Sequence, residues 1–126
     1  MQKNEAQNPI AAVGDMESSA RAVADAIGDI SKPSDITEVI NTLSRVQQVM
    51  SQVYAGLASW HGLVELGVHH AGEELPVDLQ NPSWVRAEVA LEEASQYSKD
   101  AAAALERARI ANMSARWFDE IRSDGV

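Results

Sequence analysis

The chain contains no cysteine, which excludes a disulfide framework, a thiol nucleophile and a thiolate metal site. It also lacks long apolar runs, since none approaches the roughly 18 to 20 residues that would span a bilayer. The polar stretch from Met1 to Asn8 has no apolar segment like that of a signal peptide. We therefore expect a cytoplasmic protein whose fold depends on packing alone.

Basic residues are scarce, with 10 Lys and Arg against 19 Asp and Glu, and the formal net charge is -9. This charge repels phosphate, which disfavours nucleic acid and anionic membranes as partners. A small acidic helical protein could instead imitate a phosphate backbone and block a nucleic-acid-binding protein. At 126 residues and 45 % apolar content, the chain is expected to form one soluble domain.

Alternating patterns typical of strands are missing, and an apolar seven-residue repeat stands out instead. One register holds Ile36, Leu43, Met50, Leu57 and Val64, and the other holds Val39, Val46, Val53 and Trp60. Alternating spacings of three and four keep one seam of a helix facing its neighbours. The repeat therefore predicts a long helix that packs on other helices along this apolar seam.

Two Asn-Pro pairs mark helix starts, because Asn can cap the free amides and Pro has the right φ for the first turn. Asn8-Pro9 begins a predicted helix over residues 9–30, and Asn81-Pro82 begins another over residues 82–122. In the first, the apolar face is predicted to be Val13, Met16, Ala20, Val23, Ile27 and Ile30. In the last, it is predicted to be Trp84, Ala87, Leu91, Ala94, Ala101, Leu105, Ala108, Met113, Trp117 and Ile121.

The helix between them begins at Asp35, which forms with Glu38 a pattern like a capping box. We extend this helix to about His70. A break near Gly62 remains an alternative, because each interior glycine costs on the order of 1 kcal/mol relative to alanine. Residues 72–80 are predicted to form a loop.

These elements predict an all-α, elongated, antiparallel three-helix bundle with a short first helix and a long hairpin made of the other two. Residues 9–122 form a single helical domain in this prediction, between disordered residues 1–8 and 123–126. The short link after the first helix sends it back along the second, where it reaches only to about Gly56. The far end of the hairpin would then expose an interaction surface of Leu57, Trp60, Leu63, Val64, Trp84 and Leu91.

The sequence accordingly favours a non-enzymatic protein-protein interaction protein, such as an adaptor, an assembly component or a small regulatory subunit. Its expected partner is a second copy, which would complete a four-helix bundle, or another protein. We see no nucleophile elbow, phosphate-binding glycine loop or dinucleotide fingerprint in the sequence. No catalytic residue, cofactor or metal ligand is assigned.

A metal-binding helical bundle is the alternative to a protein-protein interaction protein. His61, Glu65 and His69 recur every four residues, and such a stripe on one helix can share a divalent ion. The same spacing also suits an ordinary polar flank with weak Glu–His pairing. The Glu-x-x-His motif of ferritin-like di-iron sites is absent.

The tripeptide Trp60-His61-Gly62 matches the Trp-x-Gly signature of the WXG100 family, which the chain also resembles in being small, acidic and free of cysteine. The resemblance implies a helical hairpin exported by a type VII secretion system, with the tripeptide in the turn between two helices of similar length. Here the predicted loop lies instead near Pro76. A Tyr-x-x-x-Asp/Glu signal follows the second helix in that family, whereas Tyr97 is followed four residues later by Ala101.

Overall fold

The computed structural model describes residues 8–30, 32–69 and 81–115 of the chain. About 84 % of these residues are helical, in three α-helices and one short 3-10 helix, and none of them lies in a strand. The predicted all-α class is confirmed. No helix in the described ranges combines the length and the apolar character needed to cross a bilayer. The termini predicted to be disordered fall largely outside the described residues.

Contacts divide the chain after Ile36 into two units. The first unit contains α1, Pro9–Ala26, and the short helix η2, Ile27–Asp29. Asn8 caps α1 as predicted, since its side-chain oxygen accepts from the amides of Ile10 at 2.9 Å and Ala11 at 3.4 Å. The α-helix ends four residues before the predicted end at residue 30, where the chain tightens into η2.

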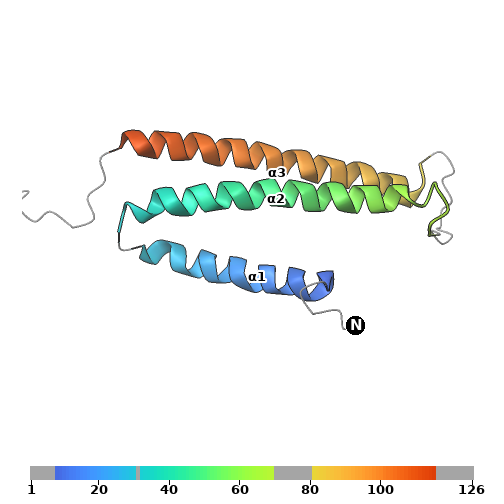
Figure 1. The fold of residues 1–126 in the computed structure, drawn as a ribbon, viewed down its shortest axis with the longest axis horizontal. Coiled ribbons are helices and arrows are strands. Elements are labelled where there is room, and N and C mark those ends of the chain that lie inside the picture. The colour runs from blue at the N-terminus through green and yellow to red at the C-terminus, as the bar shows by residue number, and fades with distance from the viewer. Residues whose placement is uncertain (1–7, 31, 70–80, 116–126) are drawn as a thin grey trace, which may run out of the picture. The chain divides into compact units, whose positions relative to one another are not determined.

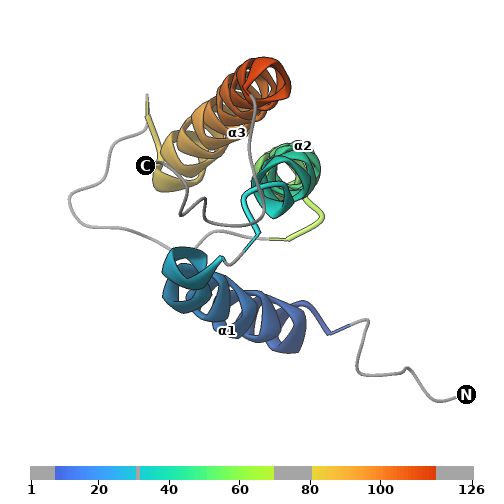
Figure 2. The same ribbon diagram turned by 90° about the vertical axis from the view of Figure 1, so that its left-hand side faces the viewer.

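The second unit, Thr37–Arg116, contains an antiparallel hairpin of α2, Asp35–Gly62, whose first two residues precede the unit, and α3, Ser83–Ser114. The two helices lie side by side along their lengths (Figures 1 and 2). At 1.5 Å per residue they are about 42 and 48 Å long. Hydrogen bonds from Ser44 to Ala102 and from Ser95 to Ser51 set the register of the hairpin.

The end of α2 corrects the predicted extension to His70. The helix ends at Gly62, and residues 63–67 continue as turns with hydrogen bonds between residues three apart. Gly67 then takes a positive φ of 76°, while the Val68 amide donates to the Leu63 carbonyl and the Gly67 amide donates to the Val64 carbonyl. This is the Schellman pattern, which needs a left-handed residue where glycine carries little strain.

The start of α3 differs slightly from the prediction. The helix begins at Ser83, and Pro82 rather than Asn81 occupies the N-cap position, with no capping hydrogen bond from its side chain. The amides of Val85 and Arg86 donate to the Pro82 carbonyl. The predicted continuation through Trp117 and Ile121 lies outside the described residues.

Small side chains, not large apolar ones, form the contact between α2 and α3. We call them the small-residue seam: Ser44, Ser51 and Ala58 of α2 with Ser95, Ser98 and Ala102 of α3, all 3 to 6 % exposed. Within the described residues no large side chain is fully buried. Small residues at a helix contact allow two helices to approach closely.

The predicted apolar seam of α2 is therefore wrong by one position. Ser44, Ser51 and Ala58 each follow a member of the predicted row Leu43, Met50 and Leu57. One residue turns an α-helix by about 100°, which carries the larger side chains around and away from α3. On α3, Trp84, Leu91 and Leu105 are half-buried as predicted. Beside these three side chains, Ser95 and Ala102 form a second row on the α3 face that meets α2. Ala108 and Met113, which were predicted to lie on the apolar face, are exposed.

Candidate functional site

An apolar face of α2 remains exposed on the side turned away from the small-residue seam. Its members recur every three or four residues, and we call them the outer stripe: Val46, Val49, Val53, Leu57 and Trp60. Each is between 39 and 56 % exposed. Single exposed apolar residues are ordinary, whereas a continuous row along one helix is a feature typical of interaction surfaces.

The exposed apolar residues of α3 do not form such a row. Val89, Tyr97, Ile110 and Met113 are 47 to 67 % exposed. Val89 and Tyr97 lie about 80° apart around the helix, and Ile110 and Met113, three residues apart, are the one pair of neighbours among them. Within the hairpin, the outer stripe of α2 is therefore the ordered apolar surface.

The structure separates the six predicted interaction residues into two groups. Leu57 and Trp60 belong to the outer stripe and are 45 and 53 % exposed. The other four, Leu63, Val64, Trp84 and Leu91, are half-buried. Leu63 and Val64 follow the end of α2, while Trp84 and Leu91 lie on the α3 face that meets α2.

Two imidazole rings flank Trp60 at the end of the stripe. The ring of His69 stacks on the indole with centroids 3.9 Å apart and planes 18° apart, and His61 meets it edge-on at 5.0 Å. The Nδ1 of His61 lies 2.7 Å from the Leu57 carbonyl oxygen, to which it can only donate. The indole is thus held on two sides while about half of its surface stays open.

The metal-binding stripe that the sequence left as an alternative loses its geometric basis because α2 ends at Gly62. His61, Glu65 and His69 cannot line one face of a helix that stops one residue after the first of them. Among the described residues, no group of three or more His, Asp or Glu side chains is placed to hold a metal ion.

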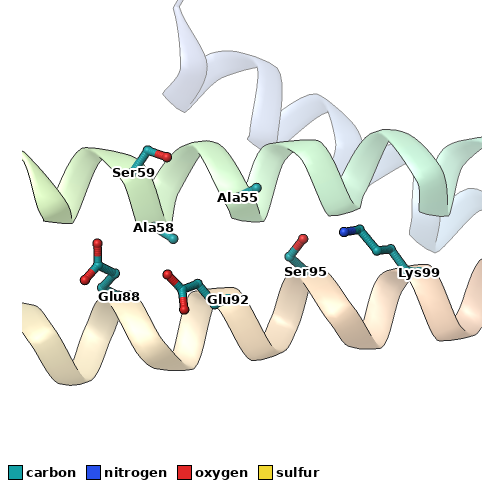
Figure 3. Close-up of a pocket in the computed structure, with 7 residues that line it drawn as sticks. All are labelled: Ala55, Ala58, Ser59, Glu88, Glu92, Ser95 and Lys99. Carbon is teal, nitrogen blue, oxygen red and sulfur yellow. The ribbon is translucent and has the colours of Figure 1, made fainter.

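A polar cleft of about 310 Å³ lies beside the small-residue seam, between α2 and α3. Figure 3 shows its lining, which is Ala55, Ala58 and Ser59 of α2 and Glu88, Glu92, Ser95 and Lys99 of α3. The hydroxyl of Ser95 donates to the Ser51 carbonyl at 2.8 Å. This serine is therefore engaged in joining the helices, and its hydroxyl proton is directed into a structural hydrogen bond.

The charges of α3 are mixed along its length. Arg109 forms two hydrogen bonds with Glu106, its Nε lying 2.9 Å from Oε2 and its Nη2 lying 2.5 Å from Oε1. The hydrogen bond from Arg109 lowers the pKa of the Glu106 carboxyl, and the same bond raises the pKa of the guanidinium. Acidic and basic residues alternate here, which does not favour imitation of a phosphate backbone.

Comparisons with protein-family models, curated proteins and solved structures found no significant match.

Sequence reasoning placed Val46 and Val53 on the α2 seam and did not include Val49 at all. One signal could have identified the exposed face. Val46 to Val64 is the longest stretch of the chain without Asp, Glu, Lys or Arg. A helix with a solvent-exposed side normally carries charge on that side, so the lack of charge on the exposed side distinguishes this stretch.

Proposed function

We propose that this chain is a non-enzymatic protein-protein interaction protein that binds a partner helix through the outer stripe of α2. The observation that supports this proposal is the arrangement of α2. Its small-residue face is occupied by α3, and its large apolar face is about half exposed. Exposed apolar side chains at helical spacing fit the groove or face of another amphipathic helix.

Trp60 is the expected anchor of this surface. Aromatic side chains dominate the binding energy of many interfaces, and truncation of a central one costs 2 kcal/mol or more. Trp60 is held by His61 and His69, so little side-chain entropy remains to be lost on binding. The small-residue seam, in contrast, is already filled and contributes to the fold.

Site-specific photo-cross-linking in the cells that naturally express the chain tests the proposal. A photoreactive residue replaces Leu57 in one variant and Tyr97, which is 67 % exposed on α3, in the control. We expect a discrete protein adduct from position 57, identified by mass spectrometry, and none from position 97. Equal labelling at both positions, or no adduct from position 57, contradicts the proposal.

A substitution then measures the contribution of the anchor. Trp60→Ala should weaken binding to the identified partner by about 2 kcal/mol, roughly a 30-fold loss of affinity. Tyr97→Ala should leave that affinity unchanged. Isothermal titration calorimetry gives both values, and an unchanged affinity for Trp60→Ala would remove this residue from the interface.

A type VII secretion protein similar to the Trp-x-Gly family is a second candidate. What favours it is that Trp60-His61-Gly62 forms the last three residues of α2, at the start of the connection between helices of 28 and 32 residues. This is closer to the arrangement of that family than a loop near Pro76 would be. The residue four positions after Tyr97 is still Ala101 rather than an acid.

Cellular location separates the two candidates. The interaction protein is expected to stay in the cytoplasm, whereas a type VII secretion protein must be exported. Fractionation of cells that express the chain distinguishes them, since secretion into the medium that depends on Trp60 and Gly62 would favour the second candidate.

A further inference from the structure

We infer that the partner of the outer stripe is a second copy of this chain, paired antiparallel about a two-fold axis at Val53. The inference rests on the proposed function and names its partner. The stripe is symmetric in its spacing, with Val49 and Leu57 four residues on either side of Val53, and Val46 and Trp60 seven residues on either side. An interface between two identical surfaces requires such self-complementarity.

The symmetric spacing determines which residues meet. In an antiparallel pair centred on Val53, this side chain packs against its own twin. Val46 comes level with Trp60 of the second copy, and Val49 comes level with Leu57 of the second copy. Each large side chain thus faces a smaller or branched one, as interdigitating helix packing favours.

Charge restricts where on its surface the chain could pair with a second copy. Two molecules with a net charge of -9 repel one another. The stripe lies within the stretch from Val46 to Val64, which carries no Asp, Glu, Lys or Arg. When two copies pair at the outer stripe, no two carboxylates face each other at the centre of the interface, where like charges would weaken binding.

Gly56 is compatible with this pairing. A glycine inside a helix costs about 1 kcal/mol relative to alanine, yet a Cβ added at Gly56 would meet nothing within 4 Å. Nothing in its own surroundings therefore requires glycine. In the antiparallel pair, Gly56 lies beside Val49 of the second copy on the same flank of the stripe, where the missing Cβ allows close approach.

The available area suits a weak dimer. Four aliphatic side chains and one indole, each about half exposed, offer on the order of 400 Å² per copy, or about 800 Å² for the pair. This is the size of a weak, transient interface. We therefore expect dissociation in the micromolar range.

Sedimentation of the purified full chain tests the inference, over concentrations of about 1 to 200 µM. The wild type should pass from monomer to dimer. Val53→Glu should weaken the dimer at least about a hundredfold, because it opposes two carboxylates at the axis. The matched control Val89→Glu changes a valine on α3 that is 47 % exposed, against 39 % for Val53, and should leave the dimer unchanged.

Charge complementation identifies the axis itself. Val53→Glu and Val53→Lys should each be monomeric alone and form a heterodimer when mixed. The absence of cysteine allows a second measurement, since Val53→Cys should oxidise to a disulfide-linked dimer while Val89→Cys should not. Gly56→Ala should weaken the dimer without lowering the thermal stability of the monomer.

Each other outcome overturns the inference. A wild type that stays monomeric at about 200 µM excludes the second copy, and an adduct between Leu57 and a different protein would then leave the proposed function intact. A dimer that tolerates Val53→Glu lies on another surface. If both Val53→Glu and Gly56→Ala destabilise a monomeric chain, the stripe is covered within the molecule, and the proposed function fails as well.

Discussion

At the scale of single residues, buried serines hold α2 against α3. The hydroxyl of Ser44 donates to the Ala102 carbonyl at 3.1 Å, and that of Ser95 donates to the Ser51 carbonyl at 2.8 Å. Both bonds are buried and link the two helices. A leucine at either position could make neither bond and would force the helices apart.

Two similar substitutions should therefore have different effects. Ser95→Ala removes a hydrogen bond between helices and should lower the free energy of unfolding by about 1 kcal/mol. Both substitutions add a better helix former. Ser51→Ala removes only a bond to the Gln48 carbonyl within α2, so it should change stability by less than about 0.5 kcal/mol. Urea unfolding followed by circular dichroism, at one protein concentration, compares them. Equal losses would show that the seam hydroxyls do not join the helices.

At the scale of the secondary-structure elements, the turn that follows α2 depends on the backbone of one residue. Gly67 adopts a φ of 76°, which costs an L-residue with a Cβ on the order of 1 to 2 kcal/mol. The hydrogen bonds between Val68 and Leu63 and between Gly67 and Val64 are formed only if the chain takes this conformation.

Gly67→Ala should consequently destabilise the turn by about 1 kcal/mol. Gly67→Asn should lose less, because asparagine tolerates the left-handed region better than alanine does. Amide hydrogen exchange at Val68 measures the opening of this turn directly. Identical exchange in all three proteins would mean that the Schellman pattern does not form in solution.

At the scale of the whole molecule, net charge opposes the association that the outer stripe favours. The chain carries a formal charge of -9, and the stripe itself is uncharged. Added salt screens the repulsion between copies, with a screening length of about 10 Å at 0.1 M. The hydrophobic contribution to association is strengthened only by salts that are strongly excluded from the protein surface.

Self-association should therefore tighten when sodium chloride is raised from about 0.02 to 0.3 M. Association that depends on ion pairs between subunits would weaken over the same range. Sedimentation equilibrium at the two salt concentrations gives the sign of the effect. Dissociation by salt would place charged contacts, not the outer stripe, at the centre of the dimer.

The sequence by itself determined where the helices begin and what class of fold they build. The Asn8-Pro9 cap and the start at Asp35 are local features, because capping and φ restriction involve only a few neighbouring residues. The seven-residue repeat likewise determined that α2 is a long helix with an apolar face. Even the end of α2 near Gly62 was among the alternatives that its glycines left open.

Only the tertiary structure decided which face of α2 meets α3. The row Leu43, Met50 and Leu57 and the row Ser44, Ser51 and Ala58 both recur every seven residues, so periodicity alone cannot choose between them. Hydrophobicity favours the first row as the core. The second row is buried because small side chains let two helices come close and exchange hydrogen bonds, and these interactions exist only once α3 lies alongside.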